Sequence, residues 1–132
     1  MFLSEQTIIV LVDRRVPKEA SSGEVLEIWG VRGSSAAIER HEGCRQALLM
    51  ENDRVTLREL DGQWEPDTVY QRVMELDDLN RIRVVFAQSD IMALAARRAI
   101  ADRDSTLLRH MCFIGVDAQI GRGLGVASIM EG

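Results

Sequence analysis

The feature that most constrains this chain is a series of short, continuous apolar segments separated by stretches with the composition of helices and turns. These segments are TIIVLV at 7–12, VLEIWG at 25–30, IRVVFA at 82–87 and MCFIGV at 111–116. A strand that is apolar along most of its length is buried on both faces, which is typical of parallel sheets covered by helices. The pattern therefore predicts an α/β fold.

A helix is predicted after the strand at 25–30. Ser34 or Ser35 can serve as its N-cap, and the helical pattern runs to about Met50. Arg40 lies at the turn between the apolar positions of this helix, which are Ala37, Cys44 and Leu48.

The rest of the chain continues the alternation of strand and helix. Residues 54–60 alternate between polar and apolar, as in an edge or half-buried strand. Pro66 suits the first turn of a helix, whose apolar positions are Val69, Val73 and Leu76. Asp90 is predicted to cap an alanine-rich helix that ends near Asp102, and residues 125–130 fit a short strand or a helix. With right-handed crossovers, this order predicts a three-layer fold: one parallel sheet with helices on both faces.

Composition limits the function classes. The 132 residues are enough for one domain, and no apolar run reaches the length of about 20 residues that a membrane span needs. With 16 basic and 21 acidic residues, the net charge of −5 opposes direct nucleic-acid binding. Neither Cys44 nor Cys112 has metal-ligand spacing to His41 or His110, so we expect buried free thiols, no metal and no cofactor.

The predicted topology points to one region for a ligand site. In an open parallel sheet, ligands bind outside the carboxyl ends of the strands. The residues that follow the predicted strands are Asp13 and Arg14, Arg32 to Ser35, Gln88 to Asp90, and Asp117. These residues are therefore the functional candidates.

One interpretation of these candidates is enzymatic. Asp13, Asp90 and Asp117 follow three apolar strands and could hold magnesium for phosphoryl transfer. Such a site also needs a cation for the phosphoryl group, and Lys18, the only lysine, is not at a strand end. The G-x-S-x-G elbow of hydrolases is absent, and so is a G-x-G-x-x-G fingerprint directly after the first strand.

The binding alternative fits the residue types better. Carboxylates accept hydrogen bonds from sugar hydroxyls, guanidinium groups donate to them, and an aromatic face covers the apolar side of the ring. The residues of this kind are Asp13, Arg14, Arg40, Asp90, Asp117 and Trp64. Three of them also have ordinary structural explanations: Asp90 as a helix cap, Trp64 as core packing and Arg40 as a solvated charge.

Four segments resemble one family in that family's order. They are VLVDRRV at 10–16, GSSAAIERHEGCRQAL at 33–48, VFAQSDIMALAARRAI at 85–100 and IGVDA at 114–118. They are similar to segments of type 1 periplasmic-binding-protein-like sugar-binding domains, whose members include solute-binding proteins, repressor effector domains and extracellular sensors of hybrid histidine kinases. The likeness covers most of 7–132 and is closest to the sensor group.

The resemblance implies a role for each candidate. Asp13 and Arg14 would grip sugar hydroxyls from the amino-terminal lobe, Arg40 would donate to the sugar, and Trp64 would be an aromatic platform. Ser89 stands where the family has an asparagine ligand, whereas Cys44 replaces a core phenylalanine. The carboxylates that the resemblance assigns to the ligand are Asp90 and Asp117.

The resemblance also implies a domain organisation. The family fold has two lobes that close on the ligand. The whole chain would then be a single α/β domain in which residues 7–14 are a remnant strand of the amino-terminal lobe and residues 24–132 an incomplete carboxyl-terminal lobe. An uncovered strand edge recruits other chains, so we expect a homodimer or segment exchange.

The function implied is recognition of a saccharide by a periplasmic or other extracytoplasmic sensor. Lobe closure would signal to a histidine kinase or deliver the sugar to a transporter. Two alternatives remain open: the cytoplasmic effector domain of a LacI-type transcription regulator, and the magnesium-dependent phosphoryl-transfer enzyme.

Overall fold

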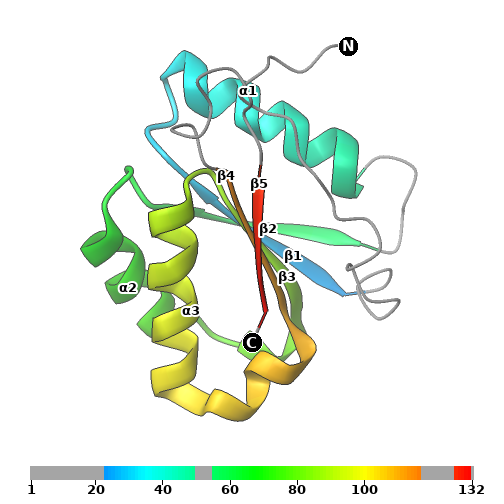
Figure 1. The fold of residues 1–132 in the computed structure, drawn as a ribbon, viewed down its shortest axis with the longest axis vertical. Coiled ribbons are helices and arrows are strands. Elements are labelled where there is room, and N and C mark those ends of the chain that lie inside the picture. Colours follow the sequence, from blue (N-terminus) through cyan, green and yellow to red (C-terminus); the bar gives the residue numbers. More distant parts are fainter. Residues whose placement is uncertain (1–22, 50–54, 117–126, 132) are drawn as a thin grey trace.

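The computed structural model describes residues 23–49, 55–116 and 127–131 as one α/β unit built on a single sheet (Figure 1). The strand order in the sheet is β2-β1-β3-β4-β5. The strands are β1 (Glu24–Trp29), β2 (Thr56–Asp61), β3 (Ile82–Ala87), β4 (Cys112–Val116) and β5 (Ala127–Glu131). The α-helices are α1 (Ser35–Cys44), α2 (Pro66–Met74) and α3 (Asp90–Asp104).

Four of the strands form the predicted parallel sheet. β1 pairs in parallel with β2 and β3, and β3 pairs in parallel with β4. A fifth strand, β5, joins this sheet and pairs antiparallel with β4. Residues 125–130 fitted either a strand or a helix, and the structure has a strand at 127–131. The predicted strand at 7–12 lies outside the described residues.

The helices cover both faces of the sheet, as the sequence predicts. α1 lies against one face, whereas α2 and α3 lie side by side against the other (Figure 1). α1 continues into a π-helical stretch at Arg45–Leu49, so the helical segment ends close to the predicted Met50. α3 is followed by a 3₁₀ turn at Ser105–His110, and another turn at Leu79–Arg81 precedes β3.

The helix starts follow simple local chemistry. The Ser34 hydroxyl accepts a hydrogen bond from the backbone N–H of Ala37, and Pro66 occupies the first turn of α2. The prediction that Asp90 caps α3 is wrong. Ser89 is the N-cap, with extended backbone and a side chain that accepts from the N–H of Met92. Asp90 is already helical and lies in the first turn, where a carboxylate interacts favourably with the helix dipole.

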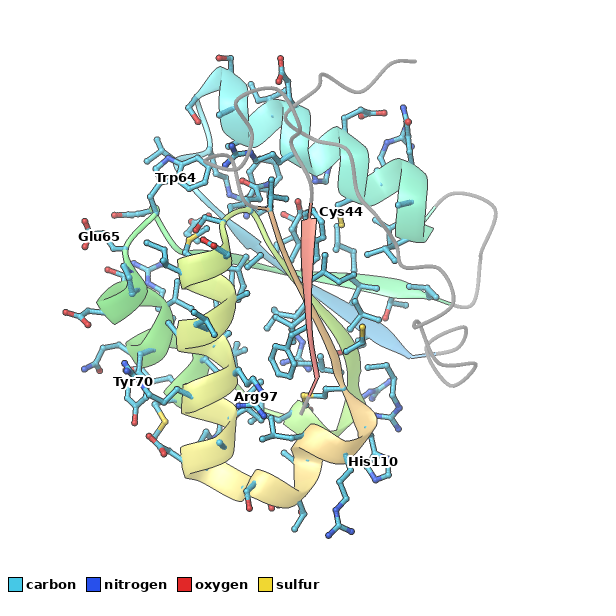
Figure 2. The ribbon with its side chains drawn as sticks, in the orientation of Figure 1. Cys44, Trp64, Glu65, Tyr70, Arg97 and His110 are labelled. Carbon is cyan, nitrogen blue, oxygen red and sulfur yellow. The ribbon has the colours of Figure 1, made fainter. Side chains whose placement is uncertain are left out.

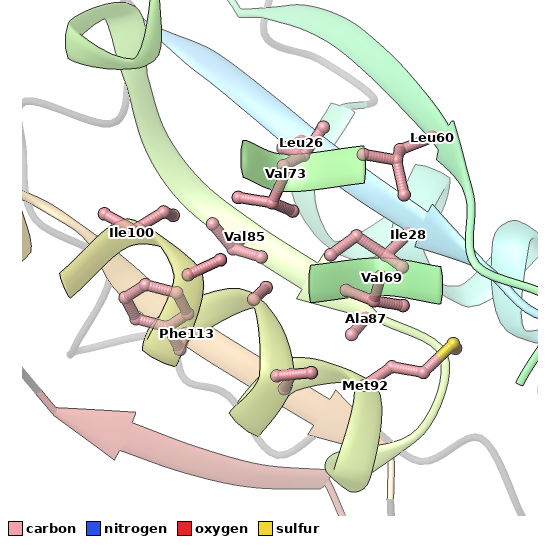
Figure 3. Packing of buried hydrophobic residues seen from close by; sticks show 14 of the residues in the cluster. Leu26, Ile28, Leu60, Val69, Val73, Val85, Ala87, Met92, Ile100 and Phe113 are labelled. Carbon is pink, nitrogen blue, oxygen red and sulfur yellow. The ribbon is translucent and has the colours of Figure 1, made fainter. Parts of the chain in front are cut away.

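Two apolar clusters lie on the two faces of the sheet. The larger joins α2 and α3 to the sheet and contains Ile28, Val69, Val73, Phe113 and Ile100, among others (Figure 3). The smaller lies under α1 and consists of Val25, Cys44, Val84, Phe86, Cys112, Ile114 and Val116.

Other sequence predictions have mixed outcomes. Both cysteines are buried and neither forms a disulfide, and β2 is an edge strand, as predicted. α2 ends at Met74, so Leu76 lies beyond the helix but still packs partly against the larger core. Among the described helices, none has the length and apolar character that crossing a bilayer requires.

Candidate functional site

Arg40 is a buried arginine on α1, near the carboxyl ends of β1 and β3. It is only 8% exposed, so the explanation of Arg40 as a solvated charge is wrong. Its Nη1 donates to the backbone carbonyl of Gln88, 2.7 Å away. Burial lowers the pKa of the guanidinium, while the negative charge of Glu39 opposes that effect. Arginine nevertheless keeps its charge in proteins. No carboxylate of the described residues forms an ion pair with Arg40 within 4 Å.

Trp64 lies beside Arg40 and gives it an aromatic neighbour. The Arg40 Cζ lies 5.3 Å from the centroid of the Trp64 ring, within the range of a cation–π contact. Trp64 occupies the turn between β2 and α2 with a φ of 63°, in the left-handed region. Figure 2 shows it on the side of the molecule where α1 begins. It also packs partly against the larger core, as the core-packing explanation predicts, while its role as an aromatic platform for a ligand stays a prediction.

Gly30 allows the Trp64 ring to lie where it does. A Cβ at residue 30 would come within 2.1 Å of Cε2 of Trp64. Only glycine leaves this space, and it directly follows β1. The ring of Trp64 therefore lies flush against the backbone at the end of that strand.

Gln88 joins the ends of β1 and β3 through both its backbone and its side chain. It is fully buried. Its backbone N–H donates to the carbonyl of Ile28 at 3.0 Å, and its Oε1 accepts from the N–H of Gly30 at 2.9 Å. Its Nε2 donates to Oε2 of Glu27 at 2.9 Å, and its carbonyl is the acceptor for Arg40. Gln88 thus links Arg40 to Glu27, Ile28 and Gly30.

Glu27 is a buried carboxylate in the middle of β1. Its Oε1 lies 2.7 Å from Nδ1 of His41, the residue after Arg40 on α1. Burial raises the pKa of Glu27, while the contacts to His41 and Gln88 act in the opposite direction. Removal of a carboxylate from water is costly unless it is paired and hydrogen-bonded, and Glu27 has both kinds of partner.

The β1–α1 loop is anchored away from this site. Arg32 forms ion pairs with Glu59 at 3.0 Å and with Asp61, and it lies over the Trp29 ring at 4.5 Å. His41 stacks on the same Trp29 ring, with ring centroids 4.6 Å apart. The sequence candidates from Arg32 to Ser35 thus hold the loop and cap α1.

One cluster has the residue types of a divalent-metal site. The donor atoms of Glu27, His41 and Glu59 lie within 4.8 Å of one another. These atoms already have protein partners, because Glu59 pairs with Arg32 while Glu27 binds His41 and Gln88. The Glu27 and His41 atoms therefore belong to the hydrogen-bond network beside Arg40, and the exposed Glu59 belongs to its ion pair with Arg32.

Ser89 and Asp90 start α3 at the carboxyl end of β3. The Ser89 hydroxyl accepts from Met92 N–H at 3.3 Å, which leaves its own O–H free to donate. Within the described part of the chain, the Asp90 carboxylate has no hydrogen-bond partner. The helix approaches β4 closely: a Cβ at Gly115 would lie 2.7 Å from the Asp90 Cα. Asp90 thus begins its helix beside the end of β4.

The structure brings the predicted site residues Arg40 and Trp64 into contact and places Ser89 and Asp90 next along the chain to the residue that holds Arg40. That residue is Gln88, whose backbone carbonyl accepts the hydrogen bond from Arg40. Asp13, Arg14 and Asp117 lie outside the described residues, so their roles stay predictions. Sequence reasoning missed Glu27 and His41. A charged residue inside the apolar strand VLEIWG was the available signal, because a strand covered on both faces must pair such a group.

Comparison with solved structures adds to this geometry. The chain is similar to the fructose-binding periplasmic domain of a hybrid two-component system, with 30% identity over 78% of this chain and a TM-score of 0.65. It is similar to a periplasmic sugar-binding protein from Pseudomonas fluorescens, with 29% identity over 78% of this chain and a TM-score of 0.66. A periplasmic solute-binding protein from Actinobacillus succinogenes, with bound D-allose, shares the fold at 15% identity over 86% of this chain and a TM-score of 0.64.

The fold and these likenesses define the class. The chain is a type 1 periplasmic-binding-protein-like domain and forms one lobe of that fold, which confirms the resemblance inferred from its sequence. It covers 34% and 32% of the first two structures and 57% of the third, so it spans a part of each. No protein-family model matches the chain, and no curated protein does. The first two structures are a fructose-binding domain and a sugar-binding protein, and the third is a solute-binding protein.

Proposed function

We propose that this chain binds a saccharide at the carboxyl ends of β1, β3 and β4. The observation that carries the proposal is the environment of Arg40, a buried arginine beside a tryptophan ring whose hydrogen-bond acceptor among the described residues is one backbone carbonyl. An arginine has five N–H groups, and a single acceptor uses only part of that capacity. The remaining groups suit a ligand rich in oxygen atoms.

The surrounding residues fit a sugar in particular. A sugar has vicinal hydroxyls, which both donate and accept, and an apolar face of C–H groups. Arg40 donates, and Trp64 offers an aromatic face. The Asp90 carboxylate, which has no hydrogen-bond partner among the described residues, accepts. We further propose that Asp13, Arg14 and Asp117 complete the hydrogen bonds, and that the Ser89 hydroxyl replaces the amide of the family's usual asparagine.

The wider role follows from the family resemblance. Residues 24–132 act as the carboxyl-terminal lobe, residues 7–14 belong to the other lobe, and the sugar lies between the two. Closure of two lobes on a ligand is a hinge motion that can report occupancy to another part of a protein. The likeness to a hybrid two-component sensor domain supports signalling to a histidine kinase from outside the cytoplasm, with delivery to a transporter as the second outcome.

Calorimetric titration of the full-length protein with D-fructose, D-allose, L-arabinose and D-ribose tests the proposal, with citrate as an anionic control. We expect one of the sugars to bind with a Kd of about 10 μM or tighter, which corresponds to about −7 kcal/mol. We expect Trp64 to report this binding as a change in tryptophan fluorescence. Binding of citrate with no sugar binding would contradict the proposal.

A further inference from the structure

We propose that Glu27, His41 and Gln88 are positioning residues for this site: a buried network that touches no ligand but fixes the Arg40 guanidinium over Trp64. This inference rests on the proposed sugar site and deepens it. All three residues lie on the α1 side of the sheet, between β1, β3 and α1. Glu27 and Gln88 are fully buried, whereas the His41 side chain is 25% exposed.

The orientation of the Gln88 amide is set by Glu27. An ionised carboxylate only accepts hydrogen bonds, so the group of Gln88 that faces it must be the NH₂. The amide oxygen then faces the backbone N–H of Gly30, which is the arrangement seen at 2.9 Å on both sides. A reversed amide would place two acceptors together at Glu27 and two donors together at Gly30.

The orientation of the Gln88 amide determines where Trp64 and Arg40 lie. The hydrogen bond from Gly30 fixes the residue on which the Trp64 ring lies. The backbone of Gln88, held by Ile28 on one side, presents its carbonyl to Arg40 on the other. His41 bonds Glu27 from the helix position next to Arg40, which anchors α1 to β1 at that point. Arg40 and Trp64 are therefore placed by the same three side chains.

The network has an internal test, because its two central side chains can be exchanged. Gln88→Glu alone sets two carboxylates against each other in a buried space. Gln88→Glu together with Glu27→Gln restores the pairing: Glu at 88 accepts from Gly30 and from the amide NH₂ at 27, whose oxygen accepts from His41. Buried charges and hydrogen bonds in one network couple strongly, so such rescue is measurable.

We would measure the affinity for D-fructose, or for whichever sugar of the panel binds, in the full-length chain. We expect Gln88→Glu to weaken binding about tenfold or more, and the exchanged pair to return to within about threefold of the unchanged protein. Gln88→Met, which removes the amide without adding charge, is also expected to weaken binding about tenfold. Unchanged affinity in both single variants, or no recovery in a folded exchanged pair, would overturn the inference.

A second readout needs no sugar. The chain has two tryptophans, so Trp29→Phe leaves Trp64 as the only one. In that background, we expect Gln88→Met to raise the quenching of Trp64 by iodide, and the exchanged pair to match its parent. If no sugar binds but quenching follows this pattern, the proposed function fails and the positioning network stands. If sugar binds but neither quenching nor affinity responds, the network fails alone.

Discussion

The two faces of the sheet are built from different chemistry. The face under α2 and α3 is lined by apolar residues that include Ile28, Val85 and Phe113, and the alanine-rich α3 packs there against β3 and β4. The face under α1 begins in the same way, with Val84 and Phe86, but near the carboxyl ends of the strands it holds a buried carboxylate, amide and guanidinium. These three are Glu27, Gln88 and Arg40.

The two faces therefore contribute differently to stability and to the geometry of the site. An apolar face is stabilised by burial of surface and tolerates volume-conserving changes. A buried polar network contributes little net stability, yet it fixes atoms in definite places because each member has few acceptable partners. We infer that the α2–α3 face holds the fold together and that the α1 face holds the site in shape. The predictions below test this contrast.

The largest expected effect is on stability at the apolar face. Phe113 is fully buried in the larger core. We expect Phe113→Ala to lower the free energy of unfolding by about 3–5 kcal/mol, because a large side chain is replaced by a cavity. Urea unfolding checks this. Sugar affinity measured on the folded fraction should stay unchanged. A loss of affinity of about a hundredfold would contradict the inference that this face stabilises the fold and does not shape the site.

A smaller effect on stability is expected from a substitution at Gly30, which lies against the Trp64 ring. Gly30→Ala places a Cβ inside the volume of the Trp64 ring, so the ring must move. We expect a loss of about 1–3 kcal/mol in stability and about a tenfold loss in sugar affinity. Gly33→Ala is the matched control, because its Cβ would meet nothing within 4 Å. Equal behaviour of the two variants would contradict the proposed contact.

The smallest effect concerns pH. Burial raises the pKa of Glu27 above its ordinary 4.5, so between that value and the raised value the folded protein binds more protons than the unfolded one. The free energy of unfolding must then fall as pH rises through this window. Glu27→Gln removes this contribution. In urea unfolding series, we expect the difference in stability between the two proteins to move in favour of the variant as pH rises above 4.5. A constant difference across this window would contradict the raised pKa.

Much of the fold follows from local sequence. Continuous apolar runs predict β1, β3 and β4, and alternation of polar and apolar residues predicts β2, while Ser34 and Pro66 mark the starts of two helices. Asp90 was assigned as a cap because aspartate and serine cap equally well, and only backbone geometry identifies Ser89. The direction of β5 is set by pairing with a strand distant in sequence, which no local pattern encodes.

The sequence predicts residues of the candidate site, but it does not predict the buried residues that hold them in place. Arg40 and Trp64 follow from the family resemblance and lie together in the structure. The Glu27–His41 contact depends on how α1 lies across β1, and the Gln88 contacts depend on the register of β1 against β3. Both sets of contacts depend on tertiary structure, so local sequence does not predict them. The presence of a glutamate in a buried strand shows that a partner is needed, but not which residue supplies it.

The central claim is that the α1 face holds a sugar site through Arg40. The most direct measurement is calorimetric titration of the cognate sugar into Arg40→Ala, with Arg45→Ala as control. Arg45 lies five residues further along the same helical segment and is exposed. Its only ion-pair partner among the described residues is Glu42. Two lost charged hydrogen bonds of about 1.5–3 kcal/mol each predict at least about a hundredfold weaker binding for Arg40→Ala. Arg45→Ala should bind like the unchanged protein. Unchanged affinity in a folded Arg40→Ala would contradict the account.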